Sequence, residues 1–137
     1  QLRQVFLSLL LNALEAMPGQ GTVTVRTLTL EEADGPKVAV EFQNKGLGAL
    51  PHSLAVINEV NPLPIEGGVP AFRGALTNRL VPGMMAGTTD SFEFVANKEG
   101  RFLLFCGVTG HGVQGMWDYL VVAKAAKAPS AQVKTKK

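Results

Sequence analysis

Short β-type runs fill the chain from residue 21 to residue 123, and they constrain the fold more than any other feature. The runs are GTVTVRTLTL, KVAVEFQN, HSLAVIN, DSFEFVAN, RFLLFC and MWDYLVVA, and the first two alternate between apolar and polar residues. In a β-strand successive side chains point to opposite faces, so alternation creates one buried face. Many short strands separated by turn residues are typical of a sandwich or barrel, and we therefore predict a mainly β fold.

The turn residues between these runs predict how the strands are connected. The first two runs are joined by the turn-rich link EEADGP. Residues 98–100, Lys-Glu-Gly, resemble a hairpin turn, which predicts that the runs on either side of them pair with each other. Residues 59–87 are rich in proline and glycine, so we expect a long connection there, with a weak strand around residues 75–81.

The N-terminal segment follows a different period. Residues 2–17 carry apolar side chains at helical spacing, and a Pro-Gly pair ends the pattern. We therefore predict an amphipathic helix over residues 1–18, followed by one β-rich domain over residues 19–124. Residues 125–137 combine lysines with alanine, proline, serine and glutamine without an apolar period, which predicts a disordered basic tail.

Composition restricts the possible functions. The chain has 137 residues, a formal net charge of +2 and one cysteine, and it has no basic stripe interleaved with aromatic residues. A domain of this length can bury a sufficient core, an internal disulfide is impossible, and nucleic-acid binding is disfavoured. Because no run of about 18 apolar residues occurs, we expect no ordinary membrane-spanning helix, and we recognise no signal peptide.

One glycine-rich loop carries the side chains with the most distinctive chemistry. It contains Cys106, His111 and Met116, and four residues separate each of them from the next. One apolar run ends at the cysteine, and another begins at the methionine. The glycines allow the backbone to turn tightly around an ion. The only other histidine is His52, which must supply a second imidazole. Two histidines, one cysteine and a weak axial methionine suit copper that cycles between two oxidation states.

Other chemistries fit these residues less well. Structural zinc takes four strong nitrogen or sulfur ligands, and the chain offers only three. Calcium and magnesium require clustered oxygen ligands, and the sequence has no acidic cluster. Cys106 with a histidine is the enzyme alternative, as a nucleophile and its base. A thiol at the end of an apolar strand, without a carboxylate nearby in the sequence, favours ligation instead. A lone buried cysteine is usually a small hydrophobic residue, so the combination carries the copper interpretation.

The segments that hold these ligands resemble the blue-copper cupredoxins, and among them the sulfocyanins most closely. The resemblance covers roughly residues 37–124 and rests on NKGLGALPHSLAVI and AGTTDSFEFVANKEGRFLLFCGVTGHGVQGMWDYLVV. In these proteins an N-x-G stretch precedes a Pro-His-Ser strand, and a C-x4-H-x4-M loop closes the site before a Trp and a last strand. Those positions are here Asn44, Pro51, His52, Ser53, Cys106, His111, Met116 and Trp117. Ser53 stands where many cupredoxins carry asparagine.

This resemblance implies a cupredoxin-like Greek-key β-sandwich with the metal at one end of the domain. It implies one copper per chain, bound by His52, Cys106, His111 and Met116, and a one-electron carrier of high potential rather than an enzyme. His111 is the expected electron port, and transiently docking redox proteins are the expected partners. The apolar rim around this port consists of Leu47, Gly48, Leu50, Gly112 and Val113. We also expect a monomer, and the resemblance implies a location outside the cytoplasm, in the periplasm or on the outer face of the cell membrane.

The first 48 residues carry a second resemblance. QLRQVFLSLLLNALEAMPGQGTVTVRT is similar to the start of the ATP-binding domain of sensor histidine kinases, in which the residue matching Asn12 binds magnesium. Asn44 replaces the nucleotide-reading aspartate of that family, and the later glycine-rich lid is missing. The alternative interpretations are therefore a nucleotide-binding kinase fragment, or a chimera of the two families. We favour a helix that packs on the sandwich.

Overall fold

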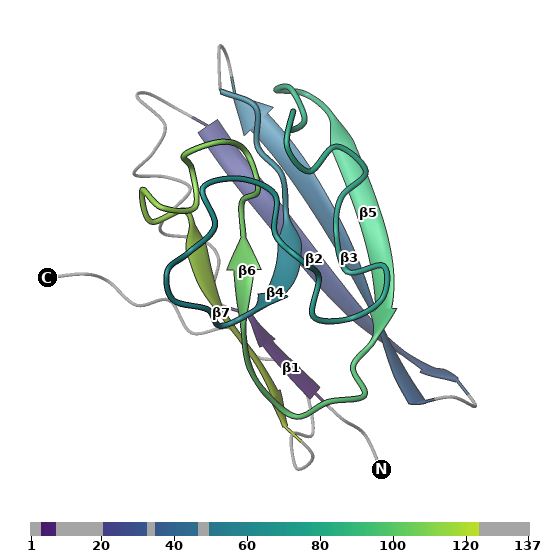
Figure 1. The fold of residues 1–137 in the computed structure, drawn as a ribbon. Coiled ribbons are helices and arrows are strands. Elements are labelled where there is room, and N and C mark those ends of the chain that lie inside the picture. Colours follow the sequence, from purple (N-terminus) through teal and green to yellow (C-terminus); the bar gives the residue numbers. More distant parts are fainter. Residues whose placement is uncertain (1–3, 8–20, 33–34, 47–49, 124–137) are drawn as a thin grey trace, which may run out of the picture.

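The protein is a sandwich of two β-sheets in the computed structural model, which describes residues 4–7, 21–32, 35–46 and 50–123 (Figure 1). One sheet has the strand order β1-β7-β6-β4, the other has the order β2-β3-β5, and all neighbouring strands are antiparallel. The strands are β1 Gln4–Leu7, β2 Gly21–Glu32, β3 Gly35–Gly46, β4 Ala55–Asn58, β5 Thr89–Val95, β6 Gly100–Phe105 and β7 Trp117–Ala123. The chain crosses between the sheets after β1, β3, β4 and β5, and the predicted cupredoxin-like Greek-key sandwich is confirmed.

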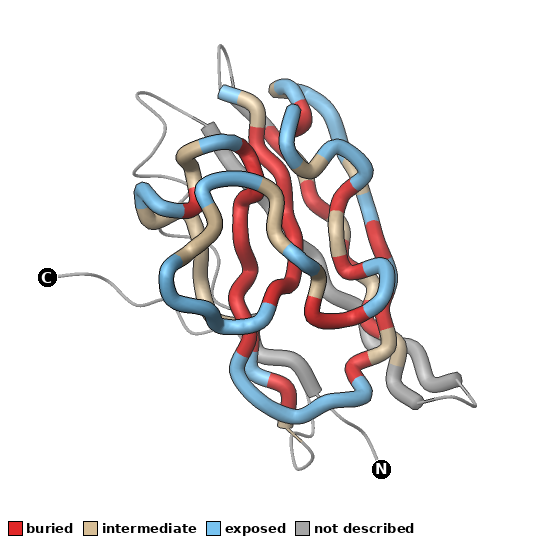
Figure 2. The backbone as a smooth tube through the Cα atoms, viewed as in Figure 1, coloured by how far each residue is buried: buried red, intermediate tan, exposed pale blue. Residues whose placement is uncertain are grey.

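The core lies between the two sheets, where the inward faces of the strands meet. As the alternating pattern predicted, Val38, Val40 and Phe42 of β3 share the buried face of their strand. They join one cluster with buried residues of both sheets, and Figure 2 shows these buried stretches along the centre of the molecule. Phe72, from the long connection, packs against Phe94 of β5 and Phe102 of β6, with ring centroids 4.9 and 4.6 Å away. Aromatic packing therefore ties the connection to both sheets.

The link at residues 98–100 does not form the predicted hairpin. β5 pairs with β3, whereas β6 pairs with β4 and β7, so this link passes from one sheet to the other. Gly100 has a φ of 140°, a conformation that side chains rarely allow, and it begins β6 at the crossing. Phe94 and Phe102 both bury their rings against Phe72, so the two strands contribute to the core from opposite sheets and do not pair with each other.

The predicted N-terminal helix is wrong over Gln4–Leu7, because these residues form strand β1. β1 pairs with β7, from Gln4 opposite Ala123 to Leu7 opposite Leu120. Without this partner β7 would be a sheet edge with unpaired N–H and C=O groups, and pairing satisfies them. The rest of the predicted helix and the predicted tail at residues 125–137 lie outside the described residues.

The long connection at residues 59–87 contains no strand, so the weak strand expected at residues 75–81 is not formed. Isolated bridges attach it to the β4 region instead, with Pro70 opposite Ile57 and Leu76 opposite Ala55. A third bridge, between Met84 and His52, attaches it to a predicted ligand. Among the residues that the structure describes, no helix is long and apolar enough to cross a membrane.

Candidate metal centre

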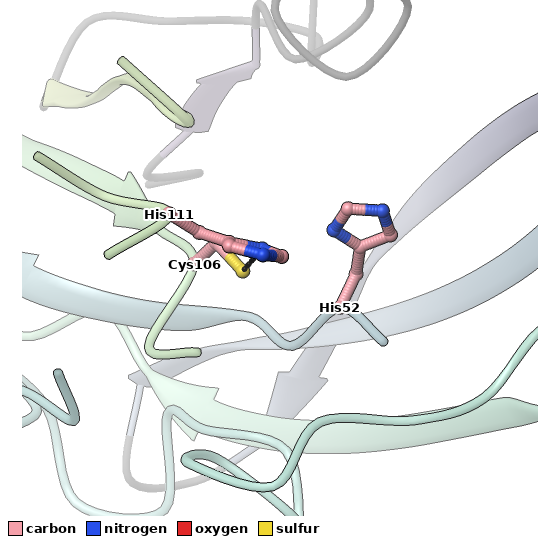
Figure 3. Close-up of side chains that lie close together, drawn as sticks. All are labelled: His52, Cys106 and His111. Atoms are coloured by element: carbon pink, nitrogen blue, oxygen red, sulfur yellow. Dashed lines mark hydrogen bonds between the residues drawn. The ribbon is translucent and has the colours of Figure 1, made fainter. Parts of the chain in front are cut away.

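The four predicted metal ligands lie together at one end of the sandwich. His52 precedes β4, Cys106 follows β6, and His111 and Met116 belong to the loop that leads into β7. The ligand atoms of the two histidines and the cysteine lie within 4.8 Å of one another. Cys106 Sγ is 3.6 Å from His111 Nδ1, and Met116 Sδ is 3.1 Å from His52 Nδ1. Figure 3 shows the sulfur beside the His111 ring, with the His52 ring facing them.

Pairing of β6 with β7 brings the two ends of the ligand loop together. Phe105 lies opposite Trp117 in the register, and the Cys106 N–H donates to the Met116 carbonyl oxygen over 3.1 Å. The Met116 N–H donates in turn to the His111 carbonyl oxygen, also over 3.1 Å. The loop therefore presents its three donor side chains from a hydrogen-bonded frame that is continuous with the sheet.

His52 is held by a short bridge to the long connection. Its N–H donates to the Met84 carbonyl oxygen over 3.1 Å, and the Met84 N–H donates to the His52 carbonyl oxygen over 2.7 Å. The Asn44 side chain, with no exposed surface, donates to the same Met84 oxygen over 3.0 Å and to the Leu50 oxygen over 3.4 Å. Asn44 therefore joins the end of β3 to the His52 segment. The amide nitrogen of Asn44, the residue that replaces the nucleotide-reading aspartate in the kinase resemblance, is thus engaged in hydrogen bonds within the fold.

Ser53 links the His52 segment to the cysteine. Its N–H donates to Cys106 Sγ over 3.4 Å, and its Oγ accepts a hydrogen bond of 3.0 Å from the Gly107 N–H. The Ser53 hydroxyl donates to the Leu80 carbonyl oxygen over 2.6 Å, whereas Oγ and Cys106 Sγ are 3.9 Å apart. The hydroxyl therefore reaches the site directly, through its contact with Cys106 Sγ, and indirectly, through the backbone of Gly107. Sequence reasoning singled out Ser53, but it missed the part that Leu80 and Met84 play.

Replacing Ser53 with alanine is expected to destabilise the metal-free protein by about 2 kcal/mol, because buried groups at Gly107 and Leu80 lose their hydrogen-bond partner. The change frees the loop directly after Cys106, so we also expect the visible band of the copper-loaded protein to shift. Chemical denaturation and absorption spectroscopy check the two effects. Ser91→Ala, at an exposed position of β5, is the control and is expected to stay within about 0.5 kcal/mol of wild type. Equal stability of the two variants would contradict this role.

Burial sets the protonation states of the donor groups. The pKa of His52 is lowered to about 4, first by burial and then by the charge of His111 nearby, and burial lowers the pKa of His111 as well. Both imidazoles are therefore neutral at neutral pH and keep a lone pair for a metal. Burial also raises the pKa of the Cys106 thiol, against the opposing effect of N–H bonds from Ser53 and Val108. A bound cation would supply the positive charge that a thiolate needs here, so the donor set fits a soft metal ion such as copper.

A two-sheet sandwich with histidine, cysteine, histidine and methionine gathered at one end is the architecture of the blue-copper cupredoxins. The family model of the Sulfocyanin (SoxE) domain matches residues 3–133, and the chain belongs to this family of blue copper proteins. The chain is also 30% identical over 106 residues to a sulfocyanin of Sulfolobus acidocaldarius, an alignment that covers 72% of this chain and 52% of the relative. It thus spans about half the length of that relative. No solved structure gives a significant match.

The family match begins at residue 3 and includes the segment that resembles a histidine kinase. The kinase resemblance and the chimera interpretation receive no support from the comparisons. Asn12, the expected magnesium ligand of that alternative, lies outside the described residues.

Proposed function

We propose that this chain binds one copper ion through His52, Cys106, His111 and Met116 and carries one electron at a time. The observation that supports the proposal most is the convergence of these four donors, from the His52 segment and the loop between β6 and β7, on one small volume. When bound there, copper supplies reversible one-electron chemistry. The protein contributes a fixed set of donors, because Met84, Ser53 and the β6–β7 pairing hold the backbone around them.

The surroundings of the donors favour a high reduction potential. Cys106 is 3% exposed and His52 is 2% exposed, so water has little access to them. Backbone N–H groups of Ser53 and Val108 bond to Cys106 Sγ, which withdraws negative charge from a thiolate. A dry site with a partly neutralised thiolate stabilises the reduced, less charged state more than the oxidised state. We therefore propose a carrier of high potential rather than an enzyme.

The surface beside His111 suits brief contacts with redox proteins. His111 is partly exposed, and Val113, two residues further on, is 48% exposed. Leu50, two residues before His52, is 55% exposed, whereas Gly112, within the ligand loop, is buried. A small apolar surface of this kind favours weak, transient docking. We propose that a monomer uses this face with its redox partners and that it works outside the cytoplasm, as the family resemblance implies.

A redox titration of the copper-loaded protein tests the proposed carrier function. Following the visible band while the solution potential is varied is expected to give a reversible transition that involves one electron per chain. Repeated oxidation and reduction should leave the spectrum and the copper content unchanged, because the donors are fixed by the fold. An irreversible transition, or copper lost on reduction, would contradict the proposal.

Replacing Met116 with glutamine is expected to lower the reduction potential of the copper-loaded protein. An amide oxygen is a harder donor than a thioether and favours Cu(II) over Cu(I). A tenfold change in the relative affinity for the two oxidation states corresponds to about 59 mV, and we expect a shift of at least this size. Met85→Gln, at a methionine that is 60% exposed, is the matched control and should leave the potential unchanged. Equal potentials in the two variants would show that Met116 is not an axial ligand.

A further inference from the structure

The only tryptophan and the only tyrosine of the chain lie side by side next to the candidate metal centre. Trp117 and Tyr119 occupy alternate positions of β7 and therefore share one face of the strand. Their ring centroids are 5.3 Å apart, in an edge-to-face arrangement. This face is the outer one of its sheet, because both rings pack against Leu103 and Phe105, whereas Leu120 points into the core. Both residues are partly exposed.

The tryptophan is connected to two of the proposed copper ligands through the backbone. Trp117 is bonded directly to Met116, and the Met116 carbonyl oxygen accepts the hydrogen bond from the Cys106 N–H. One peptide bond therefore separates the indole residue from the thioether ligand, and one further hydrogen bond separates it from the thiolate ligand. A route of this kind would couple the indole ring electronically to a metal ion held by these ligands.

Tyr119, the member of this pair further from the metal centre, lies beside a carboxylate that can accept its proton. Its hydroxyl donates to Glu59 Oε1 over 3.3 Å. Arg101 holds the same carboxylate with two hydrogen bonds, of 2.9 and 2.8 Å, and its guanidinium carbon lies 4.3 Å from the centroid of the Tyr119 ring. The Arg101 and Glu59 side chains are 54% and 42% exposed, so the cluster reaches the surface. Removing an electron from a tyrosine releases the phenolic proton, and a fixed carboxylate within reach can accept it.

We propose that Tyr119 and Trp117 form a second electron path, by which strong one-electron oxidants that reach the Glu59–Arg101 surface draw an electron from the metal centre without contacting His111. The proposal rests on the proposed copper function. The oxidants concerned are radicals or high-potential metal complexes, because tyrosine and tryptophan are harder to oxidise than a copper(I) site. Oxidising equivalents that arrive at Tyr119 therefore run downhill towards the metal.

Electrons and protons balance along this path. The oxidant takes one electron from Tyr119 while the phenolic proton moves to Glu59. The Trp117 indole then returns one electron to Tyr119, and Glu59 returns the proton to the phenol. Finally the Trp117 indole recovers one electron, which a reduced copper ion held by His52, Cys106, His111 and Met116 would supply. The net result is an oxidant reduced by one electron and a metal centre oxidised by one electron, with both aromatic side chains restored.

The metal-free protein tests the pair of Tyr119 and Glu59 independently of copper binding. The probe is tris(bipyridine)ruthenium(III), generated by a light flash, and the readout is electron paramagnetic resonance of rapidly frozen samples. Because the chain has one tyrosine, a tyrosyl signal comes from Tyr119. We expect this signal in the wild type, its loss in Tyr119→Phe, and a reduced yield in Glu59→Gln, whose amide is a poor proton acceptor. Arg101→Gln keeps the carboxylate and should retain the signal, so equal yields in the wild type and Glu59→Gln would overturn the assignment.

The copper(I)-loaded protein tests the complete path with the same oxidant. In the wild type we expect the tyrosyl signal to disappear and the visible band of the oxidised site to rise in a fast phase. Tyr119→Phe keeps the aromatic packing but should lose this phase, while slower direct oxidation remains. Val121→Ala, on the same face of β7, is the control and should behave as the wild type. A tyrosyl signal that persists beside bound copper(I), or an unchanged fast phase in Tyr119→Phe, would overturn the path. A protein that forms the radical but binds no copper would refute the carrier function instead.

Discussion

Replacing Cys106 with serine is expected to abolish the blue colour of the copper-loaded protein and to weaken copper binding by about 100-fold or more. The cysteine supplies the soft thiolate that defines this class of site, whereas a serine hydroxyl is a neutral, hard donor. Losing an outer partner of a ligand already costs about 10- to 100-fold in metal affinity, so losing a ligand should cost at least the upper value. Visible absorption and competition with a copper chelator measure the two effects.

The fold itself should tolerate this substitution, which separates ligation from structure. Serine is close to cysteine in size, and the buried position can supply hydrogen bonds from the N–H groups of Ser53 and Val108. We therefore expect the metal-free variant to melt close to the wild type. Survival of the blue band in Cys106→Ser would refute the assignment of Cys106 as a ligand.

Replacing Gly112 with alanine is expected to disrupt the ligand loop by steric conflict alone. A Cβ atom at this position would lie 2.0 Å from Cζ of Phe105, far inside van der Waals contact. Phe105 has no exposed surface and cannot turn away, so the loop that carries His111 must move. Overpacking of a core typically costs about 1–3 kcal/mol, and the displaced histidine should also weaken copper binding. Thermal melting of the metal-free protein and a copper titration measure these losses.

A double substitution identifies the steric origin of this effect. Phe105→Leu shortens the side chain that the new methyl group meets. As a single substitution it should lower stability, but in the Gly112→Ala background it should restore part of the copper binding. The two changes are therefore expected to be non-additive by at least about 0.5 kcal/mol in a double-mutant cycle. A Gly112→Ala variant with wild-type melting and spectrum would contradict the close packing of the loop on Phe105.

The strand faces could be predicted from the sequence because a period of two dictates them locally. Val38, Val40 and Phe42 are buried together as predicted. The turn at residues 98–100 could not be interpreted in the same way, because turn residues predict a reversal of the chain but do not determine whether the flanking strands share a sheet. The apolar residues within Gln4–Leu7 are compatible with a helix and with a strand. The segment forms a strand because it pairs with the backbone of β7, which would otherwise be a sheet edge.

The donor residues of the candidate site could be predicted because three of them are close in sequence. The loop spacing brought Cys106, His111 and Met116 together, and a count of the histidines added His52. The supporting contacts could not be predicted, since they come from an irregular connection whose register leaves no periodic signal. The same holds for the contact between Glu59 and Tyr119, whose partners are 60 positions apart in the sequence.

Titration of the metal-free protein with Cu(II), followed by visible absorption, tests the central claim most directly. The proposed ligand set predicts an intense blue band that grows in proportion to added copper and stops at about one equivalent per chain, as expected for a single site with a thiolate ligand. A protein that stays colourless with copper bound, or a band that keeps growing well beyond one equivalent, would contradict it.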